Sequence, residues 1–379
     1  MTDRINIITS HSGLRALAKE LSKSTVVACD LEADSMYHYR EKVCLLQLAT
    51  ERLTAVVDPL AVPNLDPLKP LFENPGIRKV FHGSDYDIRS LHRDFQIEIL
   101  NLFDTELACR FLGARSTGLE PVLKRVFGVT LDKKYQKRDW SRRPLPEDML
   151  RYAARDTIYL VDLSKILLLQ LIEKQRFTWV TEECEILSRV RIAPTDDKPL
   201  YLKFKGAGRL NRRNLAVLEG LLQFRNRIAK KKDRPLFKVM GSDSIKNLVA
   251  RRPTNKKSLK AAKILSPRQI EMFGSDIINI IKTAMDIPSK DLPSYPRKRP
   301  PAIDPAVPKR IQCLKAWRDA KARELKINPP LLFTKSLMAS IAGANPTQLG
   351  QFTGLPEMRN WQIEEFGKEI IALFKEMPV

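Results

Sequence analysis

Two carboxylates stand two residues apart near the start of this 379-residue chain, where Asp30 and Glu32 follow the apolar run Val26–Ala28. The run has the composition of a buried strand, and side chains two apart on a strand share a face. Carboxylates that point the same way repel each other unless a cation lies between them, and oxygen ligands suit Mg²⁺ or Mn²⁺. A lone Asp-x-Glu is more often a solvated strand end, so a metal site requires further carboxylates downstream.

The first such carboxylates follow the strand predicted at Lys79–His82. Asp85 and Asp87 open a helix expected over residues 85–94. The helix dipole alone would favour acidic residues in this first turn. The alternative is that one of them reaches the same end of the sheet as Asp30.

The second set lies in a long helix expected over residues 148–169. Tyr152 and Asp156 are four residues apart, so they share a helix face. Taken alone, this pair is explained by a surface aspartate beside a half-buried tyrosine. Taken with the earlier acids, it completes a set of four carboxylates: Asp30, Glu32, Asp87 and Asp156.

Four converging carboxylates and a tyrosine suit a two-metal phosphodiesterase. One ion activates water and the other stabilises the leaving oxygen, with about 3.5–4 Å between them. A tyrosine hydroxyl, with a pKa of about 10, stays protonated and can hold the attacking water.

The elements that must position these residues form a mixed α/β pattern. The sequence predicts helices over 11–22 and 67–72, strands over 43–49, 53–57 and 102–103, and helices from 105 onward. The connection at 50–52 has hairpin length, so the strands that flank it are expected to be antiparallel. Hairpin strands followed by strand–helix alternation predict a mixed sheet with helices on both faces.

Three motifs in this order resemble the DEDD exonuclease superfamily in its tyrosine-bearing branch. They are Asp30-Leu31-Glu32, His82-Gly83-Ser84-Asp85-Tyr86-Asp87 and Tyr152-Ala153-Ala154-Arg155-Asp156, and the segment 134–145 resembles the one that precedes the third motif in ribonuclease D. The resemblance implies a ribonuclease H-like fold and removal of nucleotides from RNA 3′ ends. It also selects Asp87 over Asp85 as the ligand of the second motif.

Residues 133–143 also have the composition of a nucleic-acid groove. Six of these residues are Lys or Arg, and Tyr135 and Trp140 lie among them. Cations that bind phosphates and rings that stack on bases serve single-stranded nucleic acid, whereas Trp140 is equally a core anchor. The candidate RNA contacts are Lys133, Lys134, Gln136, Lys137, Arg138, Arg142 and Arg143.

Composition indicates a reduced, globular protein with a polyanionic partner. Hydrophobic residues make up 43%, and the five cysteines form no C-x-x-C motif. No apolar run is long enough for a membrane span and no secretory signal is evident, so we expect a cytoplasmic protein. Residues 1–200 carry a net charge of +1 and residues 201–379 carry +21, a one-sided excess that predicts a polyanionic partner.

The second half contains an internal repeat. Residues 270–278 match residues 363–371 at six of nine positions, and each copy follows an amphipathic helix, a proline turn and a short helix. This pair resembles tandem HRDC domains, the helical modules that follow the exonuclease in ribonuclease D. The expected domains are an α/β ribonuclease H-like exonuclease domain at 1–200, a first all-α HRDC domain at 208–288, a proline-rich linker at 289–303 and a second HRDC domain at 304–379.

The first helical copy is the more basic of the two. Residues 201–290 carry a net charge of +16 and residues 291–379 carry +5. A solvated face would explain any one of these cations. The set proposed to contact RNA is Arg212, Arg213, Lys230, Lys231, Lys232, Arg251 and Arg252.

The sequence therefore predicts a metal-dependent 3′–5′ exoribonuclease that uses two Mg²⁺ or Mn²⁺ ions. The expected substrates are RNAs with free 3′ ends, such as tRNA precursors. Two alternatives stay open: a DNA-directed exonuclease, and a non-catalytic RNA-binding protein on the same scaffold. Nothing in the sequence demands a protein partner, so a monomer is expected.

Overall fold

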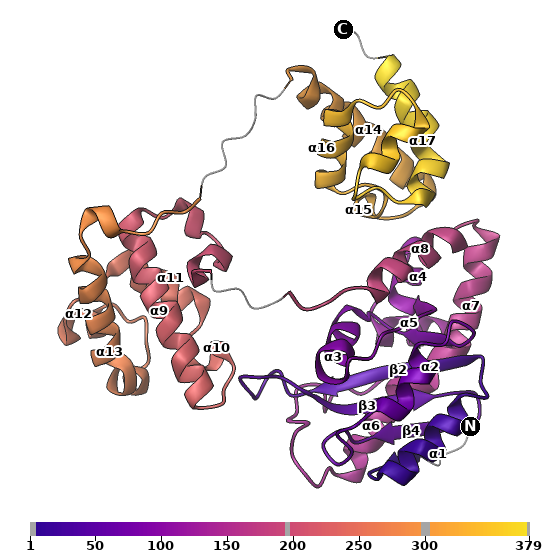
Figure 1. The fold of residues 1–379 in the computed structure, drawn as a ribbon, viewed down its shortest axis with the longest axis horizontal. Coiled ribbons are helices and arrows are strands. Elements are labelled where there is room, and N and C mark those ends of the chain that lie inside the picture. The colour runs from indigo at the N-terminus through magenta and orange to yellow at the C-terminus, as the bar shows by residue number, and fades with distance from the viewer. Residues whose placement is uncertain (1–4, 194–197, 297–303, 377–379) are drawn as a thin grey trace. The chain divides into compact units, whose positions relative to one another are not determined.

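The computed structural model describes residues 5–193, 198–296 and 304–376, which form two compact units (Figure 1). The first, here called the sheet unit, comprises residues 1–33, 42–192 and 302–379. The second, the helical unit, comprises residues 34–41 and 193–301. The C-terminal segment thus belongs to the same compact unit as the N-terminal sheet. Part of the predicted linker, residues 297–303, lies outside the described residues.

A six-stranded mixed sheet forms the centre of the sheet unit. Its strands are β1 (Ile5–Ile8), β2 (Val26–Ala33), β3 (Val43–Ala49), β4 (Thr54–Val57), β5 (Arg78–Phe81) and β6 (Leu102–Asp104), in the spatial order β1-β4-β3-β2-β5-β6. The pairings β2–β3 and β3–β4 are antiparallel, as predicted for the hairpin, and the other three are parallel. The sequence did not predict β1, a four-residue strand that pairs with β4.

Helices cover the sheet on both faces. Those before the C-terminal segment are α1 (His11–Leu21), α2 (Lys69–Phe72), α3 (Asp85–Phe95), α4 (Thr105–Phe111), α5 (Leu119–Phe127), α6 (Glu147–Ile158), α7 (Leu160–Glu173) and α8 (Phe177–Ser188). The apolar cluster under α6 contains Leu45 of β3, Val56 of β4 and Trp140. A larger cluster contains Leu46 and Leu48 of β3. The alternation along β3 therefore divides its side chains between two cores.

The prediction of one continuous helix over residues 148–169 was wrong. The structure has two helices, α6 and α7, that meet at Tyr159. The hydroxyl of the buried Thr157 donates to the carbonyl of Ala154 at 3.1 Å. Such back-bonding competes with the helix ladder and bends helices. Hydrophobic periodicity does not reveal it, because the apolar pattern continues across the break.

The C-terminal segment of the sheet unit is a small helical domain. Its helices are α14 (Ala306–Leu325), α15 (Pro329–Leu332), α16 (Lys335–Ala344) and α17 (Asn360–Lys375). Trp361 of α17 stacks on Trp179 of α8 with ring centroids 4.6 Å apart. The guanidinium of Arg176 donates to the carbonyls of Phe111 and Leu325. These contacts join the C-terminal domain to the core beside the sheet.

The helical unit has the same order of elements as the C-terminal domain. Its helices are α9 (Arg212–Lys231), α10 (Leu236–Val239), α11 (Ser242–Arg251), α12 (Lys256–Ala261) and α13 (Pro267–Asp286), and Figure 1 shows α9 beside α13. The two copies of the sequence repeat fall in α13 and α17. The repeated glycine is needed for close packing, because a Cβ on Gly367 would lie 2.6 Å from the side chain of Leu349.

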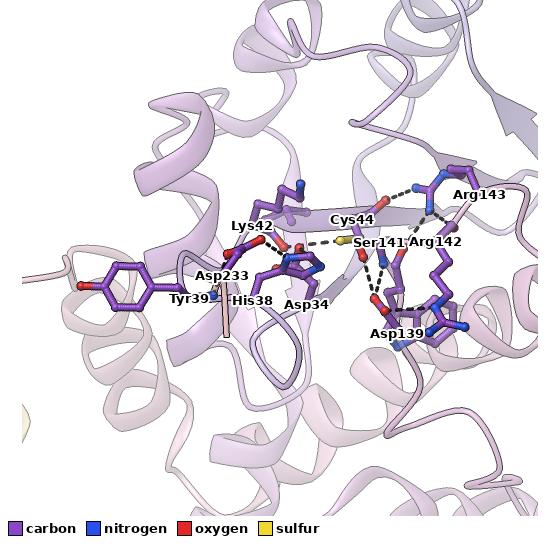
Figure 2. A network of polar contacts seen from close by, with 12 residues as sticks. Asp34, His38, Tyr39, Lys42, Cys44, Asp139, Ser141, Arg142, Arg143 and Asp233 are labelled. Carbon is purple, nitrogen blue, oxygen red and sulfur yellow. Dashed lines mark hydrogen bonds and ion pairs between the residues drawn. The ribbon is translucent and has the colours of Figure 1, made fainter. Parts of the chain in front are cut away.

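Residues 34–41 also belong to the helical unit by their contacts. The carboxylate of Asp233 accepts from the backbone N–H of Tyr39 and pairs with His38 at 2.7 Å (Figure 2). The Tyr39 hydroxyl donates to Asn226 of α9 at 2.7 Å. Across the described part of the chain, no helix is both long and apolar enough to cross a membrane.

Candidate active site

Asp30 and Glu32 lie inside β2, which continues to Ala33 rather than ending at the acidic pair. The strand register places Asp30 opposite Gln47 and Glu32 opposite Leu45 of β3. Both carboxylates therefore share the face that α6 covers, as their spacing predicted.

Asp87, and not Asp85, lies buried in the first turn of α3. Asp85 is exposed, and Arg89 binds both of its carboxylate oxygens at 2.8 and 3.0 Å. Asp87 is 8% exposed. The helix dipole and the ion pair with Arg89 are enough to explain an acidic residue at position 85. They do not explain why a carboxylate is buried at position 87.

Asp104 fixes the turn that carries Asp87, and the sequence reasoning missed it. This carboxylate is buried and accepts from the backbone N–H groups of Gly83 and Ser84 at 3.0 and 2.7 Å. It also caps α4 by accepting from the N–H groups of Glu106 and Leu107. Gly83 has φ +74°, a conformation that favours glycine. The sequence could have identified Asp104 as a helix cap, because it directly precedes α4. Its hydrogen bonds to the loop after β5 could not be predicted, because they join segments that are distant in the sequence.

Tyr152 and Asp156 lie on α6, and aromatic side chains hold the tyrosine ring. Trp140 stacks on the Tyr152 ring with a centroid distance of 6.1 Å, and Tyr135 meets it edge-on at 5.6 Å. Trp140 is 1% exposed, so it is a core residue. The segment 133–143 thus supports the catalytic tyrosine candidate through two of its rings.

The pKa of every carboxyl in the predicted set is raised, and burial is the largest cause in each case. The pKa of Asp30 lies well above its usual range because the side chain is buried and the three other carboxylates repel its charge. Burial, with repulsion from Asp156 and Asp87, raises the pKa of Glu32 to about 9. Burial is also the main reason that the pKa values of Asp87 and Asp156 rise to about 7. The charges of Glu32, Asp87 and Asp156, which come from β2, α3 and α6, therefore all act on Asp30.

A pocket of about 330 Å³ opens beside this cluster. Its lining includes Asp30, Tyr152 and Asp156 together with Lys133 and Gln136. A second pocket, of about 210 Å³, shares Tyr152 and Asp156 and adds Lys134, Arg151 and Arg155. Three of the five predicted catalytic residues thus border the same hollow as part of the basic segment, whereas Glu32 and Asp87 are not among the residues that line it.

His82 lines the first pocket beside Asp30. Its Nδ1 lies 2.9 Å from the hydroxyl of Thr105, which in turn donates to the carbonyl of Phe81. Burial lowers its pKa, which favours the neutral ring. These contacts give this histidine a structural role beside the pocket.

The cations of residues 133–143 differ in how they are used. The Arg143 guanidinium binds both oxygens of Asp58, at 2.6 and 2.7 Å. It also donates to the Cys44 carbonyl, as Figure 2 shows. Arg142 pairs with Asp139 at 3.2 Å, and Lys133 with Glu120 at 2.7 Å. Arg143 therefore joins the segment to the sheet. Lys134, Lys137 and Arg138 are exposed.

The candidate cations of the helical unit also divide into two groups. Arg212 donates to the carbonyl of Leu292, and Arg213 to those of Ala284 and Ile287, so these two hold the segment after α13. Arg251 donates to the carbonyl of Ala262, and Arg252 contacts the sulfur of Met285. Lys230, Lys231 and Lys232 are exposed at the C-terminal end of α9.

Gln47 is a polar residue in the sheet that the sequence reasoning did not select. It is fully buried, and within the described residues neither its Oε1 nor its Nε2 has a hydrogen-bond partner. An unsatisfied buried amide costs about 1–3 kcal/mol. The only sequence signal is a glutamine inside the apolar run Val43–Ala49.

Comparison with known proteins places both halves of the chain in one family. A family model described as 3′–5′ exonuclease matches residues 5–172, and one described as HRDC domain matches 214–281 and 308–373. Ribonuclease D of Pseudomonas paraeruginosa is 28% identical over 369 residues, which cover 97% of this chain and 96% of that relative.

Solved structures agree with these matches. The catalytic core of RRP6 from Trypanosoma brucei, in a variant form, is 30% identical, with a TM-score of 0.65 over 76% of this chain and 82% of that chain. Escherichia coli RNase D shares the fold, with a TM-score of 0.73 at 24% identity over 99% of this chain and 100% of that chain. The predicted fold class and resemblance are confirmed: the chain belongs to the ribonuclease D family, whose members join a 3′–5′ exonuclease domain to HRDC domains.

Proposed function

We propose that this protein shortens RNA from the 3′ end by hydrolysing the terminal phosphodiester, with two divalent ions held by Asp30, Glu32, Asp87 and Asp156. The observation that carries the proposal is a set of four carboxylates from β2, α3 and α6, of which Asp87 is buried and the other three are half-buried. Repulsion by other members of the set contributes to the raised pKa values of Asp30 and Glu32. Carboxylate oxygens are the hard ligands that Mg²⁺ and Mn²⁺ prefer.

The donor set fits a divalent cation on chemical grounds. Within the residues that the structure describes, no group of three His, Cys, Asp or Glu side chains is arranged to hold a metal ion as it stands. The assignment therefore rests on the all-carboxylate chemistry and on the repulsion that a cation would relieve. When bound, such ions supply an activated water and charge stabilisation for the leaving oxygen.

The protein's own groups orient the reactants. The Tyr152 hydroxyl holds the attacking water, and its pKa is raised above the usual value by burial and by Asp156, so it stays a donor at neutral pH. Water adds to the terminal phosphorus and the P–O3′ bond breaks. The products are a nucleoside 5′-monophosphate and a shortened RNA with a new 3′ hydroxyl. Exposed cations of residues 133–143 contact the incoming strand.

The substrate class we propose is structured RNA precursors, such as tRNA precursors with 3′ extensions. The +21 net charge of residues 201–379 supports a polyanion partner, and the relatives named above are ribonucleases by name. A DNA-directed enzyme uses the same chemistry, so the experiment compares both polymers.

The test is digestion of 5′-labelled RNA and of DNA of the same sequence, with Mg²⁺ or with EDTA. We expect a ladder that shortens from the 3′ end of RNA only, and loss of activity in EDTA. Asp87→Asn should abolish hydrolysis, whereas the matched Asp85→Asn, two residues away and bound by Arg89, should retain it. If Asp87→Asn hydrolysed RNA as fast as Asp85→Asn and the wild type, Asp87 would not belong to the site. Cleavage in EDTA would rule out the metal mechanism.

A further inference from the structure

Gln47 occupies a position in β3 where an apolar side chain would suit the fold better. The residue is fully buried, and in the described part of the chain both polar atoms of its amide are without a hydrogen-bond partner. Its neighbours along the strand, Leu46 and Leu48, are apolar and buried. A polar group buried without a partner opposes folding, so an explanation for this amide must come from something other than packing.

The sheet register supplies that explanation. Gln47 pairs with Asp30 on one side and with Val56 of β4 on the other. Directly opposite residues in an antiparallel pair project from the same face, with Cβ atoms about 4.5–5.5 Å apart. The amide therefore stands beside the Asp30 carboxylate, on the face that α6 covers with Tyr152 and Asp156.

Glu32 provides an internal comparison. Its partner on β3 is Leu45, a buried apolar residue. Of the two residues that face the acidic pair across this ladder, only Gln47 carries a polar group. The amide thus lies opposite Asp30 and not opposite Glu32. Within the part of the chain that the structure describes, no other hydrogen bond of the Gln47 amide would have to break for it to bind the Asp30 carboxylate.

We propose that Gln47 is a positioning residue, whose side-chain amide donates a hydrogen bond to the Asp30 carboxylate and orients it toward a divalent cation. Carboxylates that ligate metals are themselves hydrogen-bonded, and loss of such a partner typically lowers metal affinity 10–100-fold. Among the described residues Nε2 has no partner, so the proposed bond forms when an ion is bound, with Nε2 on one carboxylate oxygen and the other oxygen left for the ion. This inference rests on the metal site proposed above.

The proposal predicts that stability and metal affinity change in opposite directions. Gln47→Met replaces the amide with an apolar chain of similar length, so the metal-free protein should unfold at the same or a higher temperature. Its dissociation constant for Mn²⁺ should rise about 10–100-fold. Leu45→Met places the same side chain opposite Glu32 and serves as the matched control, with Mn²⁺ affinity within twofold of wild type.

The measurement is Mn²⁺ titration of the full chain without RNA, followed by electron paramagnetic resonance of the free ion, beside metal-free thermal unfolding. Unchanged Mn²⁺ affinity in Gln47→Met would overturn the positioning role. Parallel losses of affinity and stability in both methionine variants would overturn it in favour of packing. If Gln47→Met fails to fold, Gln47→Leu takes its place, and failure of both shows that the amide is needed for folding, which also contradicts the proposal.

Wild-type and Asp30→Asn proteins separate this inference from the proposed function. If the wild-type chain binds no Mn²⁺, or Asp30→Asn binds it equally well, the metal site itself is wrong. If the wild type binds and Asp30→Asn does not, while Gln47→Met matches the wild type, only the role of Gln47 is refuted.

Discussion

Replacing Trp361 with alanine should destabilise the sheet unit more than any change at its surface. Trp361 lies on α17, is 2% exposed and stacks on Trp179 of α8 at 4.6 Å and 20°. It also meets Phe111 edge-on at 5.7 Å, and its indole N–H donates to Glu183 at 3.2 Å. The substitution therefore removes one ring from the contact between the C-terminal domain and the core beside the sheet.

The magnitude follows from this burial. Truncating a buried tryptophan to alanine costs about 3–5 kcal/mol, out of a typical unfolding free energy of about 5–15 kcal/mol. The stack with Trp179 accounts for about 0.5–1.5 kcal/mol of this loss. We therefore expect Trp361→Ala to retain its fold at low temperature but to lose about 3–5 kcal/mol of unfolding free energy.

Urea denaturation followed by tryptophan fluorescence measures this quantity for the sheet unit alone. The four tryptophans of the chain, at 140, 179, 317 and 361, all belong to that unit. Leu169→Ala is the matched control, because Leu169 is 68% exposed on α7 and should lose less than about 0.5 kcal/mol.

Two results would contradict a stabilising role for Trp361. A difference in unfolding free energy of less than about 1 kcal/mol between Trp361→Ala and Leu169→Ala would show that α17 does not support the core. A double-mutant cycle with Trp179→Ala isolates the stack, and a coupling energy near zero would show that the two rings do not interact in solution.

Three further outcomes are expected. Tyr152→Phe should bind RNA normally but slow single-turnover hydrolysis by about 10²–10⁴, since it loses only the water-orienting hydroxyl; an unchanged rate would leave the third motif to Asp156 alone. The pKa of Asp156 in the folded, metal-free protein is about 7, which lies above its value in the unfolded chain. The folded protein therefore binds this proton more tightly than the unfolded chain does. The stability that the bound proton contributes is lost as pH rises through 7. Metal-free melting temperatures at pH 5.5 and 8 should therefore fall more steeply for wild type than for Asp156→Asn; parallel curves would contradict this. Changing Lys230–Lys232 to serine should flatten the slope of log K against log salt for single-stranded RNA by up to about 2, at about 0.7 per lost contact, and an unchanged slope would place the RNA elsewhere.

The chemistry proposed for the site could be predicted from the sequence because it depends on local spacing. Side chains two apart on β2 share a face, and those four apart on α6 share a face, whatever surrounds them. Asp30 with Glu32, and Tyr152 with Asp156, could therefore be paired from the sequence alone. The internal repeat likewise predicted that α13 and α17 are equivalent helices.

Tertiary structure decided which charged groups are available. Helix-dipole arguments do not distinguish Asp85 from Asp87. The motif resemblance selects Asp87, and the structure adds the physical difference, which is the burial of Asp87 and the ion pair of Asp85 with Arg89. Arg143 and Arg213 were predicted to contact RNA. In the structure the Arg143 guanidinium binds Asp58, and that of Arg213 binds the carbonyls of Ala284 and Ile287 at the end of α13. A cation's partner lies tens of residues away, so composition cannot reveal it.

Tertiary structure also decided what supports the site. Asp104, the break at Tyr159 and the place of Gln47 opposite Asp30 depend on strand register and on bonds between distant loops. The stack of Trp179 on Trp361 joins residues 182 positions apart in the sequence. Periodicity reports which face of an element is apolar, but not which distant element covers it, and that choice is made by packing.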